Sequence, residues 1–238
     1  MLQPGYLILH DWIRSHEGVD ILRNLSSING QHLRPYGLLE RPMFPSNISL
    51  ENVHYKIVVV GKSGVGKTST IAKLSGHPIP SIHSETAGIQ VTKMYWPVKI
   101  AHLNKVVLMN LELWDTGEIA LKKFDHISPA CKSGVDGILF LFSFVDKGSW
   151  DEIPNLISRL TEPNDKLAKL VIGTKFDQFS HSEVSQRELR EFEVRWQIPL
   201  KTVSNIVSTE SSINDIVPVL NCLCEHLCHR DVLGEESK

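Results

Sequence analysis

The sequence predicts an α/β fold in which a mostly parallel six-stranded sheet, with one antiparallel edge strand, carries helices on both of its faces. Short apolar runs alternate with helix-like stretches along most of the chain, and a glycine-rich loop joins the first run to the next helix. Polar motifs also follow several of the runs at their carboxyl ends. Because an open α/β sheet binds its ligand at that edge, the same order predicts where a site lies.

The expected elements alternate as this fold requires. In chain order they are strand 55–60, helix 67–75, a hairpin-like pair of strands 91–100 and 105–114, strand 137–143, helix 149–160, strand 168–173, helix 185–195, strand 199–203 and helix 213–229. Two loops, 77–90 and 115–131, flank the hairpin and are the segments expected to respond to a ligand.

The glycine-rich loop is the most specific motif in the chain. Its glycines let the backbone turn N–H groups inward as an anion cradle, Lys67 reaches terminal phosphates, and the Thr68 hydroxyl can ligate Mg²⁺. A glycine-rich turn without a ligand is the alternative, but every fixed position of the motif is filled in the required strand-to-helix setting. The predicted phosphate-binding residues here are Ser63, Gly64, Val65, Gly66, Lys67, Thr68 and Ser69.

Two further motifs supply carboxylates after buried strands. Asp115 follows the apolar run 106–113 at the carboxyl end of the expected strand, which positions it to hold the water shell of Mg²⁺. Asp177 follows the run 170–173 and can accept hydrogen bonds from both N1 and N2 of guanine, whereas adenine presents no such pair of donors. A site that leaves a buried polar group unpaired with the wrong ligand discriminates by roughly 10⁴. The chain is therefore expected to bind GTP with Mg²⁺.

These motifs, taken together over about residues 55–229, resemble the Ras-like small GTPases, and the phosphate loop and Thr86-Ala87-Gly88 look like the Rab branch. The resemblance implies the P-loop small-GTPase fold, and it implies that Thr86, 19 residues after Lys67, completes the Mg²⁺ shell and contacts phosphate. It also implies that Gly117 holds the γ-phosphate. For the guanine base it implies Thr174, Lys175, Asp177 and Ser204, the last through its backbone N–H.

A closer resemblance is to the Rem- and Rab-like small GTPases of the ciliogenesis and planar polarity effector group. The segments that carry it are 38–42, 62–68, 121–126 and 175–178. This resemblance implies a GTP-loaded cytoplasmic subunit that works at ciliary basal bodies in membrane and cargo delivery. The implied partners are an effector complex with Inturned, Fuzzy and WD-repeat subunits. The effector surface is expected at Ile89, Val91, Trp114, Leu121 and Phe124, although Val91 and Trp114 are equally well explained as core.

The second loop departs from the family pattern Asp-x-x-Gly-Gln. A gapless alignment puts Glu118 on the glycine position, and a one-residue deletion puts Gly117 there with Glu118 on the glutamine position. Neither alignment supplies the glutamine that orients the attacking water, and a carboxylate adds charge repulsion beside the γ-phosphate. Glu118 is thus the candidate catalytic residue, and hydrolysis is expected to be slower than the order of 10⁻⁴ s⁻¹ of Ras.

Composition agrees with one domain and two flanking segments. We expect an extension over 1–50, a tail or a docking element, then the GTPase domain over 51–229 and a tail over 230–238 without a prenylation signal. No direct lipid anchor is therefore expected. A net charge of −2 and the lack of a basic stripe argue against nucleic-acid binding. The cysteines near the C-terminus fit a helix face better than a metal site.

Three functions fit these observations. The first is a GTP-dependent switch or assembly subunit with weak hydrolysis, favoured by intact loading motifs beside a missing glutamine. The second is a conventional cycling GTPase whose partner supplies a catalytic group. The third is another phosphate-loop enzyme such as an ATPase or kinase, against which Lys175-Phe176-Asp177 argues through guanine selection.

Overall fold

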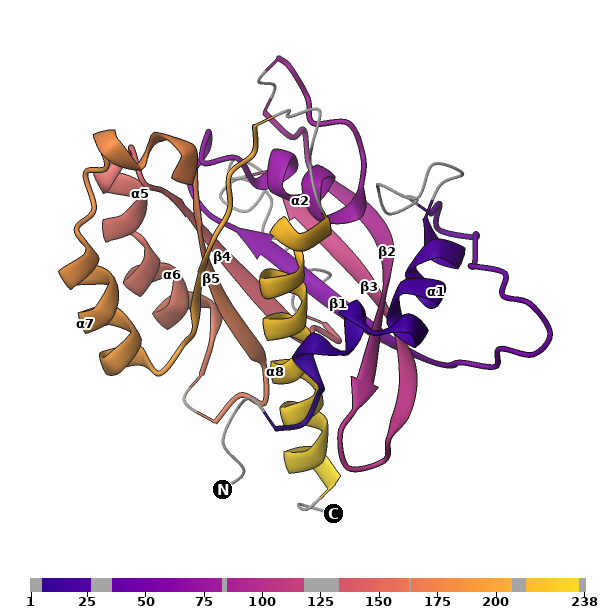
Figure 1. The fold of residues 1–238 in the computed structure, drawn as a ribbon. Coiled ribbons are helices and arrows are strands. Elements are labelled where there is room, and N and C mark those ends of the chain that lie inside the picture. The colour runs from indigo at the N-terminus through magenta and orange to yellow at the C-terminus, as the bar shows by residue number, and fades with distance from the viewer. Residues whose placement is uncertain are drawn as a thin grey trace.

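The computed structural model describes residues 6–26, 36–82, 85–117, 133–162, 164–206 and 213–235. Its centre is a six-stranded sheet in the order β2-β3-β1-β4-β5-β6, which Figure 1 shows with helices on both sides. The strands are β1 (Glu51–Val60), β2 (Ile89–Ile100), β3 (Lys105–Thr116), β4 (Gly137–Ser143), β5 (Ala168–Thr174) and β6 (Leu200–Thr202). The helices are η1 (His10–Arg14), α1 (His16–Leu25), α2 (Lys67–Ser75), α5 (Lys147–Asp151), α6 (Ile153–Leu160), η2 (Phe176–His181), α7 (Gln186–Trp196), η3 (Ile213–Asp215) and α8 (Val217–Glu235).

Strand direction confirms the predicted fold class. β1 runs parallel to both β3 and β4, β5 runs parallel to β4 and β6, and only the edge strand β2 is antiparallel to its neighbour β3. β1 starts four residues earlier than its apolar run, because Glu51 already pairs in register with Val107. This topology brings the carboxyl ends of β1, β3, β4 and β5 to one edge of the sheet, where the predicted motifs follow.

The two faces of the sheet bury separate apolar clusters. On one face, α2 and α8 cover the side chains of β1, β2 and β3, including the fully buried Trp96 and Leu113. On the other face, α5, α6 and α7 cover β4 and β5, with Phe142 and Trp150 in ring contact at 4.7 Å between centroids. Side chains alternate between the faces along β1, so that Ile57 belongs to the first cluster and Val58 to the second.

Local sequence explains where the helices begin and end. α2 begins directly after Gly66 and ends before Gly76, and both glycines have the left-handed conformation that other residues disfavour. α7 begins with a capping box, in which Ser185 and Glu188 each satisfy a backbone N–H of the first turn. Proline near its start favours α6 as a separate helix beyond Glu152, which divides the expected helix 149–160 into α5 and α6.

The N-terminal segment lies against the same face as α8. Figure 1 shows it crossing α8 and then lying beside β2 as η1 and α1. Its apolar side chains join the first cluster, namely Ile8, Trp12, Ile13, Ile21, Leu22 and Leu25. Further along, Phe44 packs against this cluster while Leu39 stays 98% exposed. The sequence predicted only a tail or a docking element over 1–50, so the extent of this packing is a finding of the structure.

Three cysteines lie on α8 as the helical spacing indicated. Cys224 is fully buried, and Cys222 and Cys228 are partly buried. Burial raises the pKa of the Cys228 thiol to about 12 and also raises the pKa of the other two thiols. All three are therefore poor nucleophiles in the folded chain. Within the described part of the chain, no helix is both long and apolar enough to cross a bilayer.

Candidate functional site

A cavity of about 750 Å³ opens at the carboxyl edge of the sheet, beside the N-terminus of α2. Most of the predicted phosphate-binding residues line it, and the loop after β5 contributes Lys175. The lining residues are Ser63, Gly64, Gly66, Lys67, Thr68, Ser69, Pro80, Ser81, Ile82, Glu85, Thr86, Ala87, Ile89, Gln90, Gly117 and Lys175. Val65 lies instead in the apolar cluster beneath the loop, where it is 1% exposed. A volume of this size is in the range of small-molecule and cofactor sites.

Backbone geometry explains why the loop needs glycine. Gly66 has a φ of +97°, and Gly61 has a φ of +152° with Leu141 O only 2.3 Å from where a β-carbon would stand. The Lys67 Nζ donates to the carbonyl oxygens of Gly61 and Lys62, at 2.9 and 3.1 Å, across the same turn. The loop therefore curls around its own lysine, which is the shape of a phosphate cradle.

Three side-chain oxygens converge below the loop. The Thr68 Oγ1 lies 2.5 Å from Asp115 Oδ2, Thr86 Oγ1 lies 3.1 Å from the same oxygen, and the two hydroxyls are 3.2 Å apart. Asp115 is 1% exposed, and its Oδ1 has no hydrogen-bond partner among the described residues. A buried carboxylate oxygen without a donor carries a desolvation penalty that a cation relieves. Two hydroxyls and a carboxylate are also the oxygen donors that Mg²⁺ prefers, so the residues fit the metal.

Gly117 connects the two loops that border the cavity. Its N–H donates to Gly88 O at 3.0 Å, and a β-carbon at this position would stand 2.2 Å from Thr86 O. Only glycine lets the segment after β3 approach the Thr86 backbone this closely. Glu118, the candidate catalytic residue, lies outside the described residues.

The residues predicted for the guanine base come together on the other side of the loop. Thr174 is fully buried, and its Oγ1 lies 2.5 Å from Val65 O and 2.9 Å from Phe142 O, which links β5 to the phosphate loop. Lys175 adopts a left-handed conformation with φ 55°, and Asp177 follows it in an exposed position. The Ser204 Oγ donates to Asp177 Oδ1 at 2.9 Å, so these two residues meet across 27 positions of sequence.

Two residues that hold this region together were missed from the sequence. The Asn205 Nδ2 donates to Thr70 Oγ1 at 2.9 Å, and the Lys73 Nζ donates to Ser204 O at 2.5 Å. Both bonds fix the loop after β6 to α2. Asn205 directly follows the predicted Ser204 in the sequence, whereas Lys73 carries no signal beyond its place in a helix.

An ion pair outside the predicted set braces the phosphate loop. The Lys62 Nζ lies 2.9 Å from Asp146 Oδ2, which belongs to the turn between β4 and α5. Burial alone raises the pKa of the Asp146 carboxyl, but hydrogen bonds from Lys62 and the Ser149 and Gly148 backbone outweigh it and leave the pKa below its usual value. Asp146 also caps α5, so the pair joins the loop to the start of that helix.

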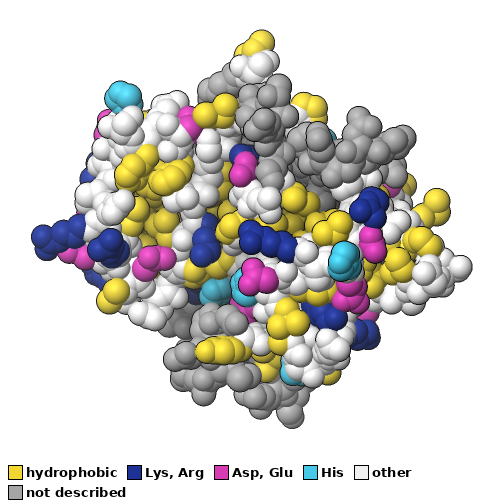
Figure 2. All heavy atoms as spheres, in the orientation of Figure 1, with side chains coloured by type: hydrophobic (Ala, Val, Ile, Leu, Met, Phe, Trp, Pro, Cys, Tyr) yellow, Lys and Arg dark blue, Asp and Glu magenta, His cyan; other side chains and the backbone are white. Residues whose placement is uncertain are grey.

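The predicted effector surface is only partly described. Ile89 and Val91 are partly buried at the start of β2. Trp114 packs partly against the cluster below α5, α6 and α7, with the Lys56 Nζ 3.9 Å from the centre of its ring. Leu121 and Phe124 lie outside the described residues. Figure 2 shows basic and acidic side chains interspersed over one face of the molecule.

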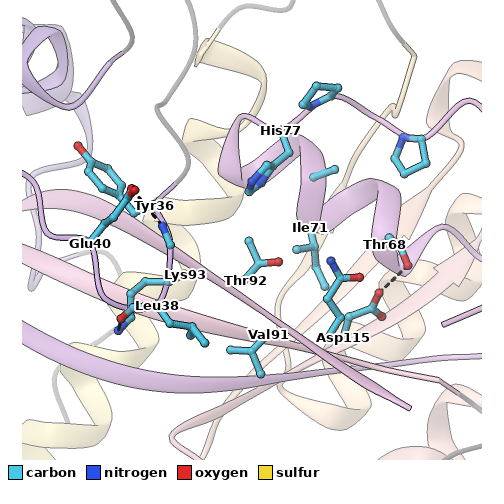
Figure 3. A pocket seen from close by; sticks show the side chains of 15 residues that line it. Tyr36, Leu38, Glu40, Thr68, Ile71, His77, Val91, Thr92, Lys93 and Asp115 are labelled. Atoms are coloured by element: carbon cyan, nitrogen blue, oxygen red, sulfur yellow. Dashed lines mark hydrogen bonds between the residues drawn. The ribbon is translucent and has the colours of Figure 1, made fainter. Parts of the chain in front are cut away.

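A second cavity, of about 670 Å³, opens beside the first, shares Thr68 and Gln90 with it, and is also lined by Asp115. Figure 3 shows the hydrogen bond between Thr68 and Asp115 at one end of the cavity and Tyr36, Leu38, Glu40 and Lys93 at the other. The N-terminal extension therefore forms a wall close to the predicted Mg²⁺ position.

Comparison with known proteins agrees with this geometry. A model of the Ras family matches residues 56–217. Proteins named ciliogenesis and planar polarity effector 2 are 45% identical in Xenopus laevis, 41% in Danio rerio and 40% in Homo sapiens. These matches cover 93%, 98% and 96% of this chain and 92%, 91% and 92% of the respective relatives. The Ras-related protein RabF1 of Dictyostelium discoideum is 28% identical, over 63% of this chain and 74% of its own.

The family match covers the phosphate loop, Asp115 near the end of β3 and Asp177 in η2 after β5. The chain therefore belongs to the Ras family of small GTPases, in the group of the proteins named ciliogenesis and planar polarity effector 2.

Proposed function

We propose that this chain is a GTP-loaded, Mg²⁺-dependent switch or assembly subunit that acts in cilium biogenesis and hydrolyses GTP slowly on its own. The observation that carries the proposal is the meeting of the Thr68 and Thr86 hydroxyls at Oδ2 of the buried Asp115, whose Oδ1 has no partner among the described residues. That meeting joins the phosphate loop, the loop before β2 and the end of β3, which are the segments a nucleotide–metal complex must connect in a switch.

In this proposal each oxygen has a separate role. The Thr68 and Thr86 hydroxyls hold Mg²⁺ directly, and Asp115 holds it through water, as suits a small cation that keeps part of its hydration shell. Bound Mg²⁺ neutralises phosphate charge. Thr86 and Gly117 then anchor the two loops beside the terminal phosphate, with the Gly117 contact to Gly88 already drawing them together.

The base is selected by Asp177, which pairs with the N1 and N2 donors of guanine. Ser204 supports that carboxylate through its hydroxyl at 2.9 Å and offers its backbone N–H to the base oxygen. Thr174 keeps the phosphate loop and β5 at a fixed separation. Lys175 lines the cavity between the phosphate and base regions.

Slow hydrolysis follows from the composition of the loop after Asp115. No glutamine stands at Gly117, Glu118 or Ile119 to orient a water. A carboxylate at Glu118 adds repulsion where charge develops on the phosphate, although it can also accept a proton. A long-lived GTP state suits a subunit that must stay ordered within an assembly.

The cellular role rests on the relatives. Their name places them in ciliogenesis and planar polarity. For this chain we propose association with an effector complex of Inturned, Fuzzy and WD-repeat subunits at the ciliary basal body, in membrane and protein transport. Ile89, Val91, Trp114, Leu121 and Phe124 are proposed as contacts, and attachment to membranes is proposed to occur through the partners.

The binding part is tested by denaturing the purified chain and identifying the released nucleotide by chromatography. GTP or GDP at near one molecule per chain supports the proposal, and Asp177→Asn is expected to abolish guanine selectivity. ATP, or no nucleotide, contradicts it. The assembly part is tested by capture of the effector complex on wild-type chain loaded with GTP or with GDP. Equal capture in both states contradicts a GTP-dependent role.

A further inference from the structure

The outer edge of β2 is covered by the chain's own N-terminal extension. An edge strand exposes unpaired backbone groups that recruit another strand, and proteins usually protect such edges. Here Leu9 N donates to Lys99 O at 2.9 Å and Ala101 N donates to Leu7 O at 2.8 Å, which is an antiparallel strand contact. Tyr36 forms a second antiparallel bridge with Lys93 further along the same edge.

The covering strand is recognised through its backbone as well as through its side chains. The Glu225 carboxylate of α8, 2% exposed, accepts the N–H of Leu7 at 2.9 Å and of Ile8 at 3.1 Å. The Asn221 Nδ2 donates to His10 O at 3.1 Å while its Oδ1 accepts from Trp96 Nε1 at 2.9 Å. These are buried polar groups arranged to take an extended segment.

Side-chain contacts define the chemistry of that segment. Ile8 is 3% exposed opposite Ile100, so an aliphatic residue anchors the strand. The Glu17 Oε2 accepts from the Lys99 Nζ at 2.7 Å, and this hydrogen bond lowers the pKa of Glu17. At the far end, the Lys93 Nζ donates to Leu38 O at 3.2 Å. The edge therefore offers an apolar position and one lysine, Lys99, that favours a carboxylate in the bound segment, whereas Lys93 is paired with Glu112 of the domain at 3.1 Å.

We propose that the edge of β2 from Lys93 to Ala101 is a strand-binding surface, which the extension occupies in cis. The partner that fits in trans is an extended segment with an aliphatic residue at the place of Ile8 and a carboxylate within reach of Lys99. Pro97 stands between the two bridges and two residues before Lys99, so its backbone nitrogen faces the same edge of the sheet. Because proline has no N–H to donate, backbone pairing is limited to the two ends of this edge. This surface is separate from the loops that bind nucleotide in the proposed function.

The test uses the full-length chain and a labelled peptide that copies residues 6–26. Ile8→Asp opens the edge, because it puts an unpaired carboxylate into a buried position close to Glu225. Leu9→Asp is the matched control, with the same charge on a neighbouring side chain that is 45% exposed. Amide exchange at Ala101 reports release of Leu7, and fluorescence anisotropy measures binding of the peptide.

Ile8→Asp is expected to speed amide exchange at Ala101 by roughly tenfold or more. It is also expected to bind the peptide at least about tenfold more tightly than the wild type or Leu9→Asp does. The reason is that the extension of those two chains competes with the peptide at millimolar effective concentration. A peptide carrying Glu17→Lys is expected to bind several-fold more weakly. Equal binding to all three chains, or none to Ile8→Asp despite faster exchange, overturns the proposal. Dimerisation of Ile8→Asp without peptide binding also overturns it.

A second variant keeps the test decisive where Ile8→Asp does not fold. Leu9→Pro removes the N–H that bonds Lys99, and the φ of −86° at Leu9 lies near the range that proline imposes. It is expected to change both readouts in the same direction. If amide exchange at Ala101 is unchanged in both variants, the contacts of Ile8 and Leu9 with β2 do not keep the extension bound, and the proposal is contradicted.

Discussion

The hydroxyl of Thr68 lies 2.5 Å from the Oδ2 of Asp115, although the two residues belong to different elements and are 47 positions apart. Thr68 stands in the first turn of α2, directly after the phosphate loop, and Asp115 stands near the end of β3. Parallel pairing of β1 with β3 makes the contact possible, because it brings Val59 and Asp115 into register just before the loop begins. The position of the proposed metal thus follows from the order of strands in the sheet.

Asp115→Asn is expected to weaken nucleotide binding in the presence of Mg²⁺ by at least about tenfold, or about 1.4 kcal/mol. The amide keeps the size of the side chain but removes the charge that holds the water shell of the metal. Dissociation of a fluorescent GTP analogue with Mg²⁺ and with excess EDTA measures the effect. Asp151→Asn, at an exposed carboxylate on α5, is the control. A variant at Asp115 that keeps full EDTA sensitivity contradicts the assignment.

Gly117→Ala is expected to separate the two loops. A β-carbon would stand 2.2 Å from Thr86 O, and relieving such overlap costs about 1–3 kcal/mol. We expect GTP to dissociate faster, by on the order of tenfold, in Mg²⁺ but much less in EDTA. Gly37→Ala is the control, since its β-carbon would meet only ordinary contacts at 3.8 Å. Unchanged dissociation would show that the contact with Thr86 does not matter for retention.

Thr174→Val is expected to lower the free energy of unfolding by about 1–3 kcal/mol, because it leaves buried carbonyl oxygens without their hydroxyl donor. Nucleotide dissociation should also become faster, since Val65 belongs to the phosphate loop. Urea unfolding measures stability, and Thr174→Ser is the matched control that keeps the hydroxyl. Greater loss in the serine variant than in the valine variant would assign the role to the methyl group instead.

Glu188 predicts a dependence of stability on pH. Hydrogen bonds from Lys147 and from Ser185 lower the pKa of Glu188 from 4.5 to about 2 in the folded chain. As pH falls, the unfolded chain takes up this proton first, so the stabilisation is complete above about pH 4.5 and is lost on the way down to pH 2.

The contribution is expected to be below about 1 kcal/mol, since the Glu188 and Lys147 side chains are each 37% exposed and solvent screens the pair. Urea unfolding at pH 7 and pH 3 measures it: Glu188→Gln should be less stable than wild type at pH 7, with a smaller difference at pH 3. Glu191→Gln changes an exposed carboxylate of the same helix outside the capping box and serves as the control. A difference independent of pH contradicts the role of charge.

The sequence predicted those parts of the fold and site that depend on short-range patterns. The spacing of Gly61 to Thr68 identifies the phosphate loop, and apolar runs identify the strands on either side of it, because a parallel sheet buried on both faces requires them. Since ligands bind at the carboxyl ends of such strands, the order of the motifs along the chain is enough to predict that Asp115 and Asp177 share one edge of the sheet.

Contacts between segments that are distant in the sequence could not be predicted from such short-range patterns. Glu225 on α8 meets Leu7 across 218 positions, and neither residue differs in sequence from an ordinary helix or strand residue. The N-terminal helices have short apolar runs that gain their stability from packing on β2 and α8, so their local signal is weak. The hydroxyl of Ser204 on Asp177 likewise follows from how β5 and β6 end side by side.

Single-turnover hydrolysis tests the central claim most directly. Purified chain loaded with GTP and Mg²⁺ is followed by chromatography of the bound nucleotide, alone and with added effector complex. Because no glutamine follows Asp115, most of the GTP is expected to persist for hours, with a rate constant below the order of 10⁻⁴ s⁻¹. Conversion to GDP within minutes, without any partner, would contradict the claim. It would show that Glu118 or a neighbouring residue orients the attacking water in place of the missing glutamine.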